Sequence, residues 1–251
     1  MLSLGLVVAV GIVLAAGGVS GFAGFGFSLV SVPLLLQIFD PATVVTLSTA
    51  LGLATNWIIV LDSWREVRVR TVLALLPWAC GGLVVGVEML KLLDPVYLKL
   101  LAGLVVIGLA VLLLCGRALP GARTPWATAL VGATSGALNT STGLSGPPIV
   151  LLFTARDFGK GDFRASASAY FFPINVIGLV LLVARGVVHG PQLGATALLV
   201  PPALIGTLAG HTLLKRVSNA SFRTLTLYLI LLTGLVGAAT ALLSLAARYH
   251  Y

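Results

Sequence analysis

Apolar runs follow one another along the whole chain, and only short polar connections separate them. Six of the runs contain about 19 to 25 residues, and a helix that rises 1.5 Å per residue needs about 20 residues to cross a hydrocarbon core of roughly 30 Å. These six are residues 43–61, 71–90, 96–115, 165–184, 192–212 and 223–247. The pattern predicts an all-α integral membrane protein in which residues 1–251 form a single membrane domain.

Other apolar runs are shorter and are interrupted by small polar residues. Residues 25–39, 124–138 and 147–154 are too short to cross the membrane as single helices, and they adjoin "GFAGFGF" (21–27) and "NTSTGLSGPP" (139–148). Glycine and proline interrupt backbone hydrogen bonding, which lipid does not tolerate. We therefore expect both stretches to be broken helices that are buried in protein or line an aqueous cavity.

An internal repeat connects the two polar stretches. At an offset of 115 residues, Ser20-Gly21 aligns with Ser135-Gly136 and Pro33 aligns with Pro148. Further along, an offset of 124 residues aligns Pro77, Gly82, Gly86 and Lys91 with Pro201, Gly206, Gly210 and Lys215. The sequence thus predicts two related halves, residues 1–119 and 120–251.

Composition and charge define the class and the topology. Mean hydropathy is +1.11 and only 9% of residues are charged, against roughly 25% in soluble domains, so the net charge of +8 has no soluble domain on which to form a nucleic-acid surface. The distribution of the basic residues instead predicts which loops face the cytoplasm, because cytoplasmic loops of membrane proteins are enriched in Lys and Arg. If each half crosses the membrane an even number of times, the two sides carry nearly equal numbers of basic residues.

The basic residues separate if 2–39 and 124–155 are helical hairpins that each return to the side they entered. One face then carries eleven basic residues and the other carries Lys91, Lys99, Arg185 and Arg248. The eleven are Arg65, Arg68, Arg70, Arg117, Arg123, Arg156, Lys160, Arg164, Lys215, Arg216 and Arg223. This arrangement predicts two inverted repeats, each a broken, re-entrant hairpin followed by three transmembrane helices. It places the protein in the cytoplasmic (inner) membrane with both termini outside the cytoplasm.

Inverted repeats with broken helices are typical of transporters, whose substrates bind between the breaks near the bilayer midplane. The free N–H groups at the start of a short helix favour an anion, and hydroxyl and amide groups add neutral donors. Asn56 and Asn175, in corresponding helices of the two halves, could extend the walls of such a site. The candidate substrate-binding residues are Ser20, Gly24, Gly26, Ser28, Asn56, Asn139, Thr140, Ser141, Thr142, Gly143, Ser145, Gly146 and Asn175.

The paired stretches "GFAGFGFSLVSVPLL" and "GALNTSTGLSGPPIVLLF" resemble the Gly-rich, Pro-ended motifs of the TauE/SafE membrane permeases. The resemblance extends over the whole chain and includes its two-half organisation. It implies export of sulfite, sulfoacetate or a related small sulfur oxyanion from the cytoplasm. One departure is Ser145-Gly146-Pro147-Pro148, where the family pattern is expected to have Gly-Gly-Pro-Pro.

Other functions remain open at this stage. An anion channel could use the same inward half-helices. "GLSG" (143–146) matches the Gly-x-Ser-Gly pattern of rhomboid-type intramembrane proteases, with His211 as the partner of Ser145, but the two prolines that follow Ser145 disfavour it. A membrane scaffold would not need the broken helices.

We expect no enzymatic activity, no cofactor and no metal site. Cys80 and Cys115 fall in apolar runs and are interpreted as packing residues. Glu88 and His211 are titratable and could couple transport to protons. The expected partners are a small anionic substrate and the lipid bilayer, and homo-oligomerisation stays open.

Overall fold

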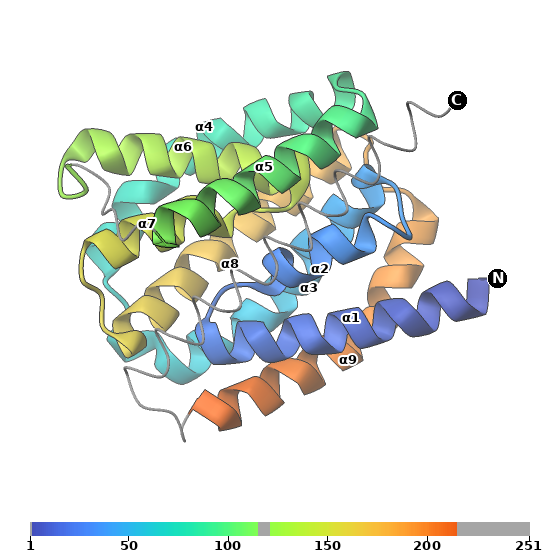
Figure 1. Ribbon diagram of the computed structural model, residues 1–251, viewed down its shortest axis with the longest axis horizontal. Coiled ribbons are helices and arrows are strands. Elements are labelled where there is room, and N and C mark those ends of the chain that lie inside the picture. The colour runs from blue at the N-terminus through green and yellow to red at the C-terminus, as the bar shows by residue number, and fades with distance from the viewer. Residues whose placement is uncertain (1, 115–120, 215–251) are drawn as a thin grey trace.

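The protein is described by a computed structural model that covers residues 2–114 and 121–214 (Figure 1). Within these residues the chain is helical and contains no strand. Five of the helices are long and apolar enough to cross a membrane: α1, α3, α4, α8 and α9. The bounds are α1 Leu2–Ala23, α2 Phe27–Leu35, α3 Pro41–Ser63, a 3-10 turn Trp64–Glu66, α4 Val69–Leu92, α5 Pro95–Leu114, α6 Pro125–Thr142, α7 Gly146–Ala155, α8 Lys160–Ala184 and α9 Gly190–Leu214. The all-helical membrane class is confirmed, and the predicted span at 223–247, like Cys115, lies outside the described residues.

Two hairpins of broken helices occur where the sequence predicts them. α1 ends at Ala23 and α2 begins at Phe27, with Gly24 and Gly26 at φ +77° and +97° between them. α6 ends at Thr142, where Gly143 has φ +78°. Because L-residues with a side chain seldom adopt positive φ, these glycines are what allow the chain to reverse. In each hairpin the short helix packs back against the long one.

Local capping sets the starts of two of the helices. Asp40 caps α3 by accepting a hydrogen bond from the Thr43 N–H at 3.0 Å, and Thr124 caps α6 by accepting one from the Ala127 N–H at 3.2 Å. A proline follows each cap, at the position where its missing N–H costs no hydrogen bond. The Asp-Pro and Thr-Pro pairs therefore fix the first turn of one helix in each half.

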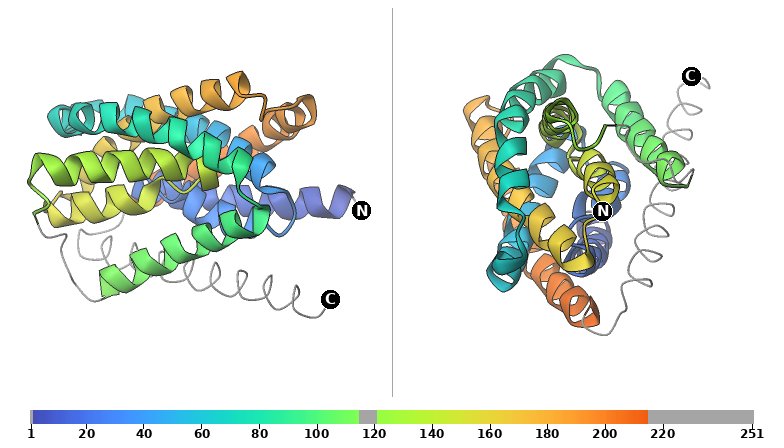
Figure 2. Two further views of the ribbon diagram at one scale, coloured as in Figure 1. Left: turned by 90° about the horizontal axis from the view of Figure 1, so that it is seen from above. Right: turned by 90° about the vertical axis from the view of Figure 1, so that its left-hand side faces the viewer.

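The long helices lie roughly side by side along one direction, and the short helices lie among them (Figures 1 and 2). α1 runs in the opposite direction to α6, as both figures show by the colours of their ends. Large apolar side chains point outward along the helices, as expected of a surface that faces lipid. They include Leu73, Val85, Leu104, Val180 and Ile205, all more than half exposed.

Glycines bring two pairs of helices into backbone contact. α1 packs along α9, and α4 packs along α6. At each interface both helices contribute two glycines four residues apart, and a Cβ added to any of the eight would lie less than 3.0 Å from a carbonyl oxygen of the facing helix. The eight are Gly17, Gly21, Gly206 and Gly210 at the first interface, and Gly82, Gly86, Gly132 and Gly136 at the second. Such small-residue pairs are a principal means of helix association in lipid, where apolar side chains alone give little driving force.

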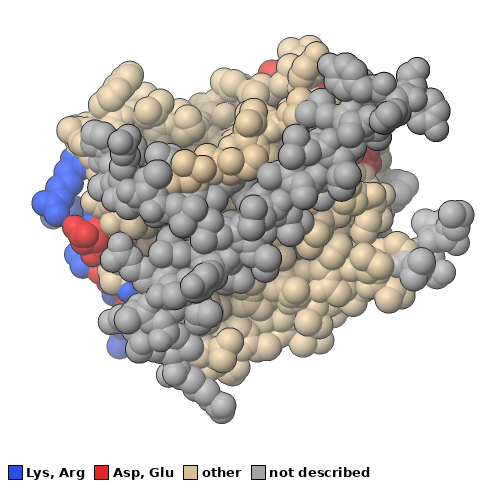
Figure 3. Space-filling model, in the orientation of Figure 1, with Lys and Arg blue, Asp and Glu red and all other residues tan. Residues whose placement is uncertain are grey.

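Lys and Arg side chains gather at one end of the molecule, the left edge in Figure 3. The connections between α3 and α4, α5 and α6, and α7 and α8 meet there. The Arg68 guanidinium pairs with Asp162, with Nε to Oδ2 at 2.8 Å, and the Arg156 Nε donates to the Ala122 carbonyl at 2.8 Å. We call this the basic end. The described basic residues of these connections are Arg65, Arg68, Arg70, Arg123, Arg156, Lys160 and Arg164.

The glycine interfaces give a direct test. Gly82→Ala should destabilise the fold, because its Cβ would collide with the Ala133 carbonyl and the nearby Ala137 N–H, and overpacking costs about 1–3 kcal/mol. Gly81→Ala is the matched control, since nothing lies within 4 Å of its Cβ. Thermal unfolding in detergent should show a lower Tm for the first variant and an unchanged or higher Tm for the second. Equal Tm values would contradict the close approach of α4 and α6.

Candidate functional site

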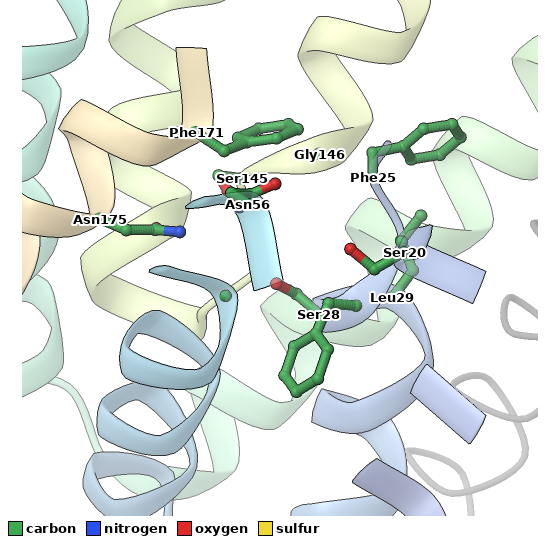
Figure 4. A pocket seen from close by; sticks show the side chains of 12 residues that line it. Ser20, Phe25, Ser28, Leu29, Asn56, Ser145, Gly146, Phe171 and Asn175 are labelled. Atoms are coloured by element: carbon green, nitrogen blue, oxygen red, sulfur yellow. The ribbon is translucent and has the colours of Figure 1, made fainter. Parts of the chain in front are cut away.

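A small cavity lies between the two breaks, and α3 and α8 complete its walls (Figure 4). Its volume of about 20 Å³ is enough for a single water-sized molecule. Twelve residues line it: Ser20, Phe25, Gly26, Phe27, Ser28, Leu29, Gly52, Asn56, Ser145, Gly146, Phe171 and Asn175. The cavity therefore brings together segments from both halves of the chain.

The N-terminus of α2 faces this cavity. Gly26 precedes the helix without a side-chain cap, and its carbonyl accepts the N–H of Val30 at 3.1 Å. The N–H groups of Phe27, Ser28 and Leu29 precede the first of these bonds and have no acceptor within the helix. Since all three residues line the cavity, the positive end of the α2 dipole contributes to it.

The N-terminus of α7 meets the same cavity from the other half. Ser145 precedes the helix without a side-chain cap, and Gly146 is the first helical residue. The carbonyl of Ser145 accepts a hydrogen bond from the Ser135 hydroxyl at 2.7 Å, which fixes the break against α6. Pro147 and Pro148 have no N–H, so α7 offers fewer backbone donors than α2.

Two asparagines, Asn56 and Asn175, line the cavity. The Asn175 carbonyl oxygen accepts from the Asn139 amide at 2.9 Å, and Figure 4 shows the Asn175 nitrogen turned into the cavity. Asn56 is only 5% exposed, and its Oδ1 has no hydrogen-bond partner. An amide oxygen only accepts hydrogen bonds, so the group that Asn56 can offer to an anion is its amide nitrogen.

The described residues that line the cavity include no charged side chain. Its polarity comes from three hydroxyls and two amides, those of Ser20, Ser28, Ser145, Asn56 and Asn175, whose side chains converge in Figure 4. Three phenylalanines lie among them. Together with the two helix N-termini, this is an environment of neutral donors suited to a small anion.

Comparison with known proteins identifies the family. A family model described as "Sulfite exporter TauE/SafE" matches residues 9–237. The chain belongs to the TauE/SafE family. No curated protein and no solved structure matches it. The family is one of membrane transporters, which agrees with the sequence resemblance and favours transport over enzymatic activity.

In this TauE/SafE protein, seven of the thirteen residues singled out from the sequence line the cavity: Ser20, Gly26, Ser28, Asn56, Ser145, Gly146 and Asn175. The other six, Gly24 and residues 139–143, lie outside its lining. For residues 139–143 the reason is a difference between the halves. At the offset of 115 residues the end of α1 corresponds to residue 138, but α6 continues to Thr142 before it breaks.

The extra turn of α6 pairs its hydroxyls with backbone carbonyls. Ser141 and Thr142 donate to Ala137 and Leu138, four residues earlier, at 2.7 and 3.0 Å. Thr140 donates instead to the Leu83 carbonyl of α4 at 2.7 Å. Thr140 thus connects α6 to α4, whereas Ser141 and Thr142 bond within α6, and none of the three supplies a donor to the cavity in this structure.

The remaining three residues lie next to the cavity lining but do not belong to it. Asn139 holds the Asn175 amide, as described above. Gly143 ends α6, and a Cβ there would collide with the Ser48 hydroxyl. Gly24 lies against the backbone of α8, where a Cβ would come within 2.7 Å of the Arg164 Cα.

Sequence reasoning missed two features of this region. Gly52 and Phe171 line the cavity but lie within ordinary-looking apolar helices, where the sequence gives no signal. Arg164, assigned from the sequence to a cytoplasmic face, is instead 4% exposed. The protease arrangement gains no support, because the structure pairs His211 with Arg164, Nη2 to Nδ1 at 2.7 Å, and with Asp62.

The role of Asn139 gives a second test. Asn139→Ala removes the hydrogen bond that orients Asn175, so if sulfite binds in this cavity its affinity should fall about threefold to tenfold, the equivalent of ~1 kcal/mol. Ser141→Ala is the control, since the Ser141 hydroxyl bonds only to its own helix. The readout is the rise in Tm that sulfite produces in detergent, as a function of concentration. Equal affinities in the two variants would remove Asn139 from the site.

Proposed function

We propose that the protein is a carrier that exports a small sulfur oxyanion, such as sulfite, sulfoacetate or a related sulfonate, from the cytoplasm. The observation that carries this proposal is the convergence of two half-helix N-termini on one neutral, polar cavity. Family membership supplies the substrate class, and the cavity supplies a chemistry that fits it.

The donor set suits a sulfonate or sulfite group. Such a group presents three acceptor oxygens and one or two negative charges, which backbone N–H groups, serine hydroxyls and the Asn175 amide can satisfy together. With no Lys or Arg among its described lining residues, the site binds through dipoles and neutral donors. Binding of this kind is modest and reversible, as release on the far side of the membrane requires.

A carrier is favoured over a channel by the size of the cavity. The cavity has room for little more than one water-sized molecule, so side chains or helices must rearrange to admit an anion with three oxygens. Binding that depends on such motion is expected of alternating access around a central site. An inside-negative membrane favours anion exit by about 2.3 kcal/mol per charge per 100 mV, which is sufficient to drive export.

The inverted-repeat architecture, with halves 1–119 and 120–251, is part of the proposal. Helix pairings support it: if α1 to α4 correspond to α6 to α9, then the contact of α1 with α9 corresponds to that of α6 with α4. The contact of α3 with α9 likewise corresponds to that of α8 with α4. The opposite directions of α1 and α6 are those expected of inverted repeats (Figure 1).

Orientation follows from the basic end. Positive-inside enrichment assigns this end to the cytoplasm of an inner membrane and both termini to the other side. A cysteine at Arg65, which is exposed there, should react with an impermeant maleimide only after the membrane is opened. A cysteine at Tyr97, which is exposed in the first turn of α5, should react in intact cells. The reverse pattern would overturn the orientation and the direction of transport with it.

The function is tested by counterflow in proteoliposomes that contain the purified protein. Labelled sulfite outside should accumulate when unlabelled sulfite or sulfoacetate is inside, and accumulate less with internal chloride, because exchange requires a shared binding site. Voltage-driven anion conductance without exchange would favour the channel. No response to any sulfur anion in sealed vesicles would contradict the substrate class.

Asn56 variants connect this transport to the cavity. Asn56→Asp places a negative charge beside the site and should reduce sulfite counterflow about a hundredfold, because like charges held together cost several kcal/mol. Asn56→Ala removes the amide without adding charge, so its loss should be much smaller. Equal effects of the two variants would mean that the transported anion does not approach Asn56.

A further inference from the structure

The side chain of Arg164 connects four helices at the basic end, although it is only 5% exposed. Its Nε donates to the Gly21 carbonyl of α1 at 3.2 Å, and its Nη2 lies 2.7 Å from the Nδ1 of His211 in α9. Its Nη1 lies 3.5 Å from the Asp62 carboxylate at the end of α3, and the His211 Nε2 lies 3.6 Å from the same oxygen. We call Asp62, Arg164 and His211 the Arg164 cluster.

The Arg164 cluster holds the first break. Beside it, the backbone of Gly24 abuts the backbone of Arg164, and the Gly24 carbonyl accepts a hydrogen bond from the Ser168 hydroxyl of α8 at 3.1 Å. The next residue, Phe25, lines the cavity, and its ring lies 5.3 Å from that of Phe163. The first turns of α8 therefore fasten the chain segment that forms one wall of the cavity.

These contacts cross between the two halves of the chain. Asp62 and Gly21 belong to the first half, whereas Arg164 and His211 belong to the second. If α1 and α9, which pack together, move relative to α8 during transport, the contacts of Arg164 with Gly21 and His211 must break. Rupture leaves the buried guanidinium of Arg164 with fewer hydrogen-bond partners, so the closed arrangement is favoured while Asp62 holds Arg164 and His211 together.

The opposite end carries a second ion pair between the halves. Glu88 of α4 pairs with Arg185, directly after α8, and both side chains are about two-fifths exposed. In the Arg164 cluster Arg164 and His211 are largely buried and Asp62 is 46% exposed, so exposure of the carboxylates does not separate the two ends. The Arg164 cluster joins four helices through several contacts, whereas the Glu88–Arg185 contact is a single ion pair, so the two ends are closed by contacts of unequal extent.

We propose that the Arg164 cluster is the gate that closes the cavity toward the basic end, with Arg164 acting as a positioning residue that holds the α1–α2 break in place. The Glu88–Arg185 pair is the weaker gate at the other end. The inference rests on the proposed function in taking the cavity as the transport site.

The test measures access to the cavity from each side of the membrane. In a background with Cys80 and Cys115 replaced by Ala, Ser145→Cys places a reporter in the cavity lining. A small impermeant methanethiosulfonate reagent is applied to inside-out and right-side-out vesicles, and a separate Arg123→Cys variant identifies which preparation presents the basic end. Because the reagent is larger than the cavity, the labelling rate reports how far the cavity opens toward each side.

Asp62→Asn should raise the labelling rate from the basic end about tenfold and leave the rate from the other side unchanged or lower, as a shift between two populations requires. His211→Ala should act in the same direction with a smaller change. Glu88→Gln should raise labelling from the opposite end. Asp162→Asn is the matched control, since it breaks the exposed Arg68 pair at the same end and should alter neither rate.

Two results would overturn the gate. One is an unchanged rate from the basic end in both Asp62→Asn and His211→Ala, each verified as monodisperse in detergent. The other is an equal increase from both sides, which would indicate general loosening of the fold. Failure of the proposed function is separate: if sulfite does not protect the Ser145→Cys reporter, the cavity is not its binding site, but the sidedness of labelling still decides the gate.

Discussion

Backbone contact between glycine-bearing helices is the constraint on which the rest of the structure depends. A broken helix exposes N–H and C=O groups that lipid cannot satisfy, so each hairpin must be covered closely along its length. Gly17 and Gly21 bring α1 against α9, and Gly132 and Gly136 bring α6 against α4. Since side chains at these positions would hold the helices apart, the glycines permit the breaks to exist within a membrane protein at all.

The cavity is lined without charged side chains among its described residues. Its described lining uses backbone dipoles, hydroxyls and amides, each of which tolerates burial when no anion is bound far better than an uncompensated guanidinium would. A neutral site of this kind must lose and regain its ligand in every cycle, and a tightly paired charge would slow both steps. The chemistry of the cavity and the requirement for turnover therefore agree.

The sequence was sufficient for the features that depend on local chemistry. Apolar length predicted α3, α4, α8 and α9 as spans, whereas α1, which is also long and apolar enough to cross, was assigned to a re-entrant hairpin. Gly24, Gly26 and Gly143 marked the breaks because only glycine adopts positive φ readily. The sequence did not predict the residue at which α6 ends. The repeat predicted equivalent breaks, but the second half continues helical for one more turn, which places Thr140 and Ser141 in helix packing rather than in the cavity. Whether a chain breaks at the first or the second permissible turn depends on contacts with α4, which the local sequence does not contain.

Arg164 illustrates the same limit for charge. Counting basic residues treats each as a solvated loop charge, and one turn into a helix that begins with Lys160 this is the ordinary expectation. Its burial instead requires Gly24, 140 positions earlier, to lack a side chain so that α8 can approach the break, and Asp62 to supply a carboxylate from α3. None of these residues is unusual by itself. Burial of the guanidinium is thus a property of three helices that meet, which gives one residue two roles: its charge favours the basic end as the cytoplasmic side, and its hydrogen bonds tie that end to the wall of the cavity.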